Sequence, residues 1–272
     1  MWFFIYSAIL IVVVWLTSVV IYSFHSGEVK FFGFRFSRRY YYLGLLVFPL
    51  AAALDAYSFS DINRFLDFVI FMFAGVAGEV IFSYWWRLFF SKNIWDYSFD
   101  TLFGNFTSLL NFIPWGVGGK LFIVLWAAFS RTFQLRLDLM QYLVFWLIFL
   151  SMWLVQVILE LVLKLRAQSL AQKNDQSVNK VYFYFILPIT VTLVLVSFAY
   201  GPGLLILAGL FGLVAFAAEY VFGKFMHQLF SKQLWHYNFK TLDGTHSSLF
   251  SIVPFALGGF YFLSIWLILT YL

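Results

Sequence analysis

The sequence contains no cysteine and few charged residues, and each shortage excludes a class of protein. Without cysteine the chain can form no disulfide, thiolate metal site or cysteine nucleophile. Only 11% of the residues are charged, whereas soluble domains carry about 25%. So few charges cannot cover a surface that faces water, and 63% of the residues are hydrophobic. We therefore expect the lipid bilayer to surround most of the chain.

Other signatures that would indicate soluble or nucleotide-dependent chemistry are also missing. The sequence has no Gly-Lys-Ser/Thr phosphate-binding loop, so we do not expect the chain itself to hydrolyse nucleotides. The net charge of +5 fits the cytoplasmic Lys and Arg residues of a membrane protein better than nucleic-acid binding. His227, His236 and His246 are nine and ten residues apart, which matches no compact helical ligand pair. We predict no metal site, no cofactor and no nucleic-acid partner.

Apolar runs that are long enough to cross a membrane recur throughout the sequence. We predict eight spans, and we interpret the first as a retained span rather than a cleaved signal peptide. The predicted spans cover residues 2–24, 41–57, 65–89, 113–133, 142–163, 181–200, 204–225 and 252–272. The predicted fold class is therefore all-α, a polytopic membrane helical bundle.

The chain also contains an internal repeat with an offset of 140 residues. Residues 91–119 align with residues 231–259 without a gap, and thirteen of the 29 positions are identical. The identical residues include Trp, Tyr, Gly and Pro, which shared apolarity alone would not align in this order. We predict two tandem four-helix repeats, residues 1–137 and 138–272. Because four spans is an even number, the repeats should share one orientation and be related by a pseudo-twofold axis along the membrane normal.

The positions of Lys and Arg predict how the spans are oriented. If the N-terminus is outside, most basic residues between spans fall on the cytoplasmic side. Only Arg64, Arg131 and Arg136 then fall outside. We predict a multi-pass protein of the cell membrane with both termini outside.

A carboxylic acid lies near the middle of both the third and the seventh predicted span. Glu79 and Glu219 are equivalent in the repeat, and a charged residue at a span centre costs about 2.5–3.5 kcal/mol on insertion scales. We expect both to face the protein interior as ion, proton or substrate sites, or else to be structural carboxylates paired with a base. Lys120 is a candidate partner of Glu79. Arg87 and His227, each eight residues beyond its glutamate, are further candidates.

A loop with the pattern W-[DH]-Y-x-F-x-T-L-x-G joins the third and fourth span of each repeat. Trp95, Tyr97, Trp235 and Tyr237 suit the membrane interface, because one end of each ring is apolar and the other is polar. Glycine and proline residues after the pattern interrupt helices, and such breaks can expose backbone groups to a ligand. An interfacial loop with a helix cap is the alternative that we favour.

Two groups of charged residues lie between the predicted spans. Asp96 occupies the position at which the second repeat has His236. These residues could pair across the pseudo-twofold axis or make one asymmetric site, although independent solvated charges are the simpler account. Asp55, Asp61 and Asp67 gather near the predicted outer face, where we expect a solvated rim rather than a cation site.

The glutamate and the loop together resemble the ABC-transporter type IV (CmpB-like) family of bacterial membrane proteins. The residues that carry the resemblance are Glu79, Leu88-Phe89, Trp95-Asp96-Tyr97-Ser98, Gly104, Ser108 and Trp115-Gly116. The second repeat fits at Glu219-Tyr220, Leu229-Phe230, Trp235, Tyr237, Gly244 and Ser248, and departs at His236 and Phe255. The resemblance implies a transport role. A fainter resemblance links the chain to lycopene-cyclase-type membrane proteins, but their Pro-x-Glu-Glu pattern is missing.

These observations predict a transporter or permease-like component with a site between the repeats, lined by the two glutamates and the loop residues. If transport is driven by ATP, a separate ATPase subunit must bind the cytoplasmic loops. The first alternative is an integral membrane enzyme that acts on a lipid or isoprenoid, and the second is a non-catalytic membrane scaffold. The transporter and the enzyme hypotheses both require a small-molecule or lipid substrate.

Overall fold

The computed structural model describes residues 28–31, 34–37, 64–90, 92–98, 101–108, 111–133, 139–167, 178–230, 233–242 and 246–271. Within them the protein is mostly helical, and six helical segments are long and apolar enough to cross a membrane. These segments are Asp67–Phe89, Phe112–Phe133, Leu139–Leu163, Asn179–Tyr200, Gly203–Lys224 and Leu249–Thr270. They confirm the third to the eighth predicted span as long apolar helices. The predicted spans at 2–24 and 41–57 lie outside the described residues.

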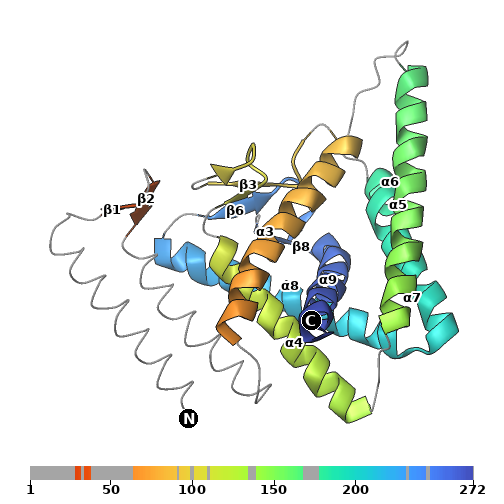
Figure 1. Cartoon of the computed structure of the whole chain (residues 1–272). Coiled ribbons are helices and arrows are strands. Elements are labelled where there is room, and N and C mark those ends of the chain that lie inside the picture. Colours follow the sequence, from red (N-terminus) through yellow and green to blue (C-terminus); the bar gives the residue numbers. More distant parts are fainter. Residues whose placement is uncertain are drawn as a thin grey trace.

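Two helix pairs form the centre of the described structure (Figure 1). Helix α3 (Arg64–Phe89) packs along α4 (Phe112–Phe133), and α8 (Gly203–Phe230) packs along α9 (Ile252–Tyr271). Helices α4 and α9 contact each other and join the two pairs. All four helices are rich in apolar residues around their whole circumference, as expected for helices buried in protein and lipid.

Four phenylalanine rings fill the space where the two pairs meet. Phe122 of α4 and Phe262 of α9 stack with their ring centres 5.7 Å apart. Phe211 makes an edge contact with Phe122, and Phe71 makes the equivalent contact with Phe262. Gly119 allows this packing, because a Cβ atom there would lie 2.7 Å from the Phe71 ring. Within the described helices, aromatic rings therefore fill the centre between the two pairs.

A third group of helices packs beside these pairs. Helix α5 (Leu139–Ala167) lies against α7 (Leu187–Tyr200), which continues from α6 (Val178–Val181) through a π-helical turn η2 (Tyr182–Ile186). Pro188 follows the π turn in α7, and it has no N–H to offer the carbonyl of Phe183. The side-chain amide of Gln156 donates to that carbonyl instead, at 2.7 Å. Such turns occur frequently at functional sites.

Short strands occupy the connections, which the all-α prediction did not include. Strands β1 (Glu28–Phe31) and β2 (Phe34–Ser37) form an antiparallel hairpin. After α3 come β3 (Trp95–Tyr97), β4 (Thr101–Leu102) and β5 (Thr107–Ser108). After α8 come β6 (Trp235–Tyr237), β7 (Thr241–Leu242), β8 (Ser247–Ser248) and the 3-10 turn η3 (Leu249–Ser251). Strand β4 pairs with β5, and β7 pairs with β8.

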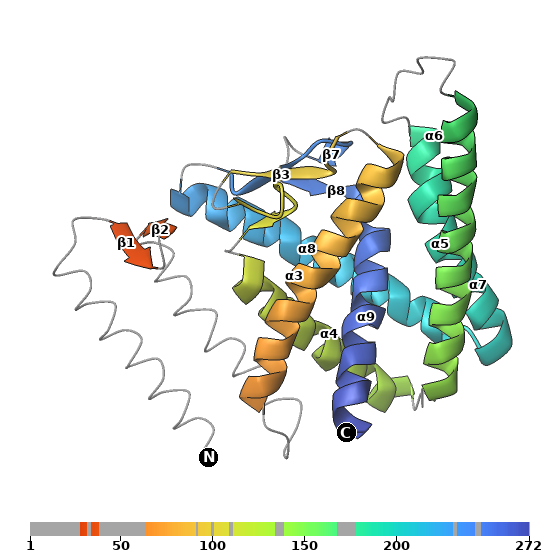
Figure 2. The same ribbon diagram turned by 45° about the horizontal axis from the view of Figure 1, so that its top comes forward.

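Strands β3 and β6 pair with each other and connect the two loops. They lie at one end of the helices, opposite the C-terminal end of α9 (Figure 2). The pairing is antiparallel, with Trp95 opposite Tyr237, Asp96 opposite His236 and Tyr97 opposite Trp235. Outside the strands, the Ser98 N–H donates to the Leu234 carbonyl and the Asn238 N–H to the Ile94 carbonyl, both at 2.8 Å. Every one of these contacts recurs when the sequence is shifted by 140 residues.

Candidate functional site

Glu79 lies in α3 with its side chain surrounded by hydrogen-bond donors, and the residue is only 6% exposed. The hydroxyl of Tyr97 in β3 donates to its Oε1 atom. Thr107 in β5 donates to Oε2 at 2.6 Å, and Trp115 in α4 donates its indole N–H to Oε2 at 3.1 Å. Asn111 donates its amide to both oxygens, at 3.1 and 2.9 Å. This number of donors matches the acceptor capacity of an ionised carboxylate.

The local chain reversal after β4 brings these donors to Glu79. Phe103, Gly104 and Asn105 have φ values of 54°, 71° and 73°, in the left-handed region that glycine and asparagine tolerate best. The reversal pairs β5 with β4 and directs Thr107 towards α3. Asn105 also accepts a hydrogen bond from the backbone N–H of Tyr97 at 3.3 Å, which fixes β3 relative to the turn.

Glu219 occupies the equivalent position in α8, but it has weaker partners. Tyr237 in β6 donates its hydroxyl to Oε1 at 2.6 Å. Ser251, at the position of Asn111, lies 3.5 Å from Oε2, and its hydroxyl makes a shorter hydrogen bond of 2.7 Å to the carbonyl of Ser248. Phe255 replaces Trp115 and carries no donor. The second carboxyl group therefore has one strong donor, and the first has four.

The tryptophans of the two loops hold the loops against the helices. The indole N–H of Trp95 donates to the Phe106 carbonyl at 3.1 Å, and that of Trp235 donates to the His246 carbonyl at 2.8 Å. Each indole also stacks on a phenylalanine of its helix, with ring centres 5.9 Å and 6.0 Å apart. Trp95 and Trp235 thus make equivalent positioning contacts, and they orient the tyrosines two residues later.

Asp96 and His236 lie opposite each other between β3 and β6, with Oδ2 and Nε2 3.7 Å apart. Three side-chain amides donate to the Asp96 carboxylate: Asn93 at 3.1 Å, Asn105 at 2.9 Å and Asn238 at 2.7 Å. The expectation of independent solvated charges is therefore wrong, because the strand pairing brings the acid and the base together.

Lys120 does not pair with Glu79, which corrects that prediction. Its ammonium group lies 3.6 Å from Asp67 and above the ring of Phe71, further along α3 and α4. Asp67 is 8% exposed and so does not belong to a solvated rim, while Asp55 and Asp61 lie outside the described residues. The second pair has apolar residues at both positions, Leu207 and Phe260.

Arg87 and His227 also lie away from the glutamates. Eight residues along a helix correspond to about 12 Å, so both side chains project near the ends of α3 and α8. Both residues are exposed, and the guanidinium of Arg87 lies 4.6 Å from the centre of the Phe106 ring. The structure therefore does not bring these predicted residues into the carboxyl sites.

Both tyrosines that contact the glutamates remain protonated. Burial, followed by the charge and hydrogen bond of Glu79, raises the pKa of Tyr97 well above its ordinary value. Burial and Glu219 raise the pKa of Tyr237 in the same way. The two hydroxyls therefore act as fixed donors to the carboxyl groups.

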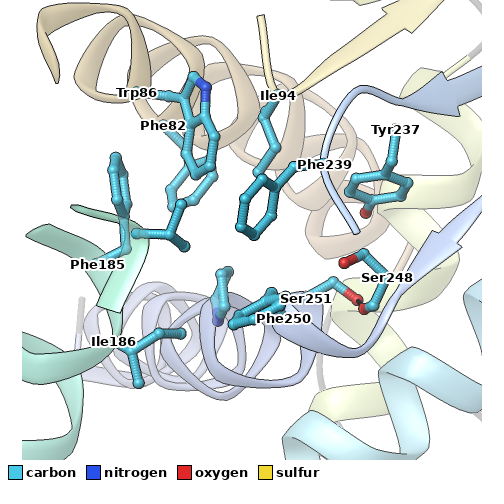
Figure 3. A pocket seen from close by; sticks show the side chains of 12 residues that line it. Phe82, Trp86, Ile94, Phe185, Ile186, Tyr237, Phe239, Ser248, Phe250 and Ser251 are labelled. Atoms are coloured by element: carbon cyan, nitrogen blue, oxygen red, sulfur yellow. Dashed lines mark hydrogen bonds between the residues drawn. The ribbon is translucent and has the colours of Figure 1, made fainter. Parts of the chain in front are cut away.

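An apolar pocket lies beside the Glu219 site, between α3, η2 and the segment from β6 to α9. Its free volume is only about 10 Å³, which is room for about one water molecule. Aromatic residues line most of it, and the hydroxyls of Tyr237, Ser248 and Ser251 lie at one end (Figure 3). Two of these hydroxyls, from Tyr237 and Ser251, are the ones nearest to the Glu219 carboxyl group.

Sequence reasoning missed Thr107, Asn111 and Ser251 as partners of the glutamates. Asn111 and Ser251 align in the repeat, and Thr107 aligns with Ser247, so a search for polar residues at matched positions before the fourth and eighth spans could have found them. Trp115 was noted for the resemblance only. Its indole N–H now belongs to the Glu79 site.

The fold and these sites define a multi-pass α-helical membrane protein with two carboxyl groups at matched positions, of which Glu79 is buried and Glu219 is half-buried. No protein-family model, curated protein or solved structure matches the chain.

Proposed function

We propose that the chain is a permease-like component of a membrane transport system, with its ion or substrate site at the interior glutamates. The observation that carries the proposal is the pair of matched carboxyl groups, each held by a tyrosine from a loop that covers the same end of the helices. A carboxyl group at the depth of a span centre is costly unless it serves binding or is fully paired. Glu219 is not fully paired.

We further infer two tandem four-span repeats of the same orientation, eight spans in all. The antiparallel register of β3 and β6 supports this inference, because Asp96 faces its own counterpart His236, as a twofold axis between them requires. The stacking of Phe122 on its counterpart Phe262 supports the same axis at the level of α4 and α9. Both loops then lie on the cytoplasmic side of the cell membrane, with both termini outside, as the basic residues favour.

This arrangement suggests how such a component could work. The centre between the helix pairs is packed with aromatic rings, so a permeating ion or molecule must pass along one helix pair rather than through the core. The loops that hold the carboxyl groups would then act as the moving parts, and an ATPase subunit, if one supplies energy, would contact the same loops. Motion of β3 and β6 would release both tyrosines together, because the two strands are hydrogen-bonded.

Flux through the purified full chain in proteoliposomes tests this proposal. Vesicles loaded with a pH-sensitive dye report proton movement after an imposed proton, sodium or potassium gradient. We expect wild-type protein to dissipate at least one gradient, and the double variant Glu79→Gln with Glu219→Gln to match protein-free vesicles.

Glu160→Gln is the matched control for this experiment. Glu160 in α5 also accepts a hydrogen bond from a tyrosine, Tyr184, at 2.5 Å, but it lies in the third helix group. Its replacement should leave the flux unchanged. Equal flux in the wild type and the double variant would contradict the transport proposal.

The aromatic lining beside Glu219 favours a second candidate, an integral membrane enzyme whose lipid or isoprenoid substrate would widen the pocket on binding. Its walls are almost wholly apolar, while hydroxyls lie at one end near Glu219 (Figure 3). An acid in that position could protonate an unsaturated chain. Lipid extracts from cells that express wild-type protein or Glu219→Gln would then differ by one product, and identical extracts would exclude this candidate.

A further inference from the structure

We propose that Glu219, with Tyr237, Ser247 and Ser251, forms a proton-binding site that exchanges its proton, and that Glu79 is its ionised counterpart. This inference rests on the proposed function, since it names the proton as the species that the interior carboxyl groups bind. It assigns different chemistry to two positions that the repeat makes equivalent.

The first argument is the number of hydrogen bonds to each carboxyl group. Glu79 accepts hydrogen bonds from four side chains, and two of them, the Asn111 amide and the Trp115 indole, direct only N–H groups at it. An added proton would have to displace or redirect one of these donors. The donors therefore stabilise the ionised form of Glu79 relative to its protonated form.

The surroundings of Glu219 favour the opposite state. Among the described residues, the shortest hydrogen bond to it comes from Tyr237 and reaches Oε1. The hydroxyl of Ser251 has a single hydrogen, which it shares between Oε2 of Glu219 at 3.5 Å and the Ser248 carbonyl at 2.7 Å. A proton on Oε2 would donate to the Ser251 oxygen and leave the Ser251 hydrogen on the shorter bond.

Ser247 is a further hydroxyl of this site. It stands at the position of Thr107, is fully buried, and has no partner other than Glu219 within the part of the chain that the structure describes. Its hydroxyl can donate to an ionised Glu219 and can accept from a protonated one, so it can remain hydrogen-bonded in both states of the carboxyl group.

Proton exchange also needs groups that can pass a proton on. Tyr237, Ser248 and Ser251 line the pocket beside Glu219, and hydroxyls can donate and accept in turn (Figure 3). The Ser248 hydroxyl reaches the carbonyl of Lys240, an exposed residue, at 2.8 Å. In the Glu79 site the corresponding partners include an amide and an indole, whose N–H groups cannot exchange a proton in this way.

Three ionisable side chains from neighbouring elements face this region. Tyr237 comes from β6, and Glu79 on α3 holds the other carboxyl group. His246, next to β8, packs against α8, because a Cβ atom at Gly223 would lie 2.4 Å from its ring. Of these groups, Tyr237 donates to Oε1 of Glu219 in both protonation states.

Infrared spectroscopy of the purified full chain tests the inference, because a protonated carboxylic acid has its own carbonyl stretching band. Near neutral pH we expect this band in the wild type, in Glu79→Gln and in Glu160→Gln, and its loss in Glu219→Gln. Raising the pH should remove the band from the wild type reversibly. Persistence of the band in Glu219→Gln, or its loss in Glu79→Gln, would overturn the assignment.

A variant that keeps Glu219 but gives it the donors of Glu79 provides the sharper test. Ser251→Asn and Phe255→Trp introduce the amide and the indole, and Ala215→Gly makes the room that Gly75 provides for Trp115. In this triple variant we expect the band to disappear although the carboxyl group is present. A retained band in a variant whose Tm equals that of the wild type would overturn the inference.

The infrared and flux experiments fail separately. A band that follows Glu219 without any flux would contradict the transport proposal and support the proton site. Flux that depends on Glu219 without a band at any pH, together with stabilisation of the protein by sodium ions, would indicate a metal cation instead of a proton and would overturn this inference alone.

Discussion

The Glu79 and Glu219 sites have the same backbone arrangement and differ in the side chains that surround the carboxyl group. Both have a glutamate on a long helix, a tyrosine two residues after a tryptophan, and an indole bound to a loop carbonyl. The framework holds the backbone, whereas the donors near Oε2 decide the state of the carboxyl group. The comparison teaches that a repeat can keep its geometry while a few side chains change its chemistry.

The difference depends on the glycine or alanine one turn before the glutamate. A Cβ atom at Gly75 would lie 2.3 Å from the Cβ of Trp115, so only glycine lets this indole approach Glu79. The second helix has Ala215 at that position, and Phe255 stands at the position of Trp115. The tryptophan of the first repeat therefore requires the glycine, and the second repeat, which has phenylalanine, can have alanine.

Neutralising each glutamate in turn should produce the largest difference between the two sites. Glu79→Gln places an amide N–H₂ group against donors, and each buried donor left without an acceptor costs about 1–3 kcal/mol. We expect the free energy of unfolding to fall by about 3 kcal/mol. Glu219→Gln resembles a protonated acid and should change it by less than about 1 kcal/mol. Denaturant unfolding in detergent micelles measures both, and equal losses would refute the asymmetry.

Gly75→Ala should have the next largest effect, because it crowds Trp115 and moves the indole away from Glu79. Overpacking of this kind costs about 1–3 kcal/mol, which a lower Tm would report. Gly209→Ala in α8 is the control, because no heavy atom lies within 4 Å of the added methyl group. If both variants kept the wild-type Tm, the packing argument would be wrong.

Trp115→Phe removes one donor from Glu79 without adding bulk. A hydrogen bond to a charged group is worth about 1.5–3 kcal/mol. Because the other donors to Glu79 remain, we expect the free energy of unfolding to fall by about the lower of these values. The variant should also let Glu79 take up a proton at a higher pH than in the wild type, seen as a second carbonyl band on acidification. An unchanged infrared titration would show that Trp115 does not govern the state of Glu79.

The smallest effect should come from His236→Asp, which places two carboxyl groups opposite each other in β3 and β6. Like charges directly opposite destabilise a strand pair by up to about 1 kcal/mol, and both side chains are partly exposed. We expect faster hydrogen exchange of the Ser98 and Asn238 amides, which bond across the strands. His236→Asn should not produce this change. Equal hydrogen exchange in both variants would show that charge repulsion with Asp96 does not weaken the strand pairing.

Much of the helical framework could be predicted from the sequence. The spans from residue 65 onwards follow from apolar runs of sufficient length, which depend only on local composition. The repeat could also be read directly, because identical Trp, Tyr, Gly and Pro residues align with a constant offset. The interior position of Glu79 follows from the cost of a carboxylate in lipid.

The partners of each charge could not be predicted, because they depend on tertiary packing. Lys120 lies only five residues after Trp115 in α4, yet the helices pack so that Trp115 contacts Glu79 and Lys120 contacts Asp67. Strands β3 and β6 are 140 residues apart and only three residues long, so no local pattern indicates their pairing. The contact of Asp96 with His236 follows from that pairing alone.

The claim that the two glutamates differ in protonation can be tested in a single sample. Carboxyl chemical shifts of isotope-labelled glutamate in the reconstituted protein, assigned with Glu79→Gln and Glu219→Gln, can be followed as the pH changes. We predict that the Glu219 signal moves from the protonated to the ionised position as the pH rises past neutrality, while the Glu79 signal stays at the ionised position. Two signals that titrate together, or a Glu79 signal at the protonated position, would contradict the account.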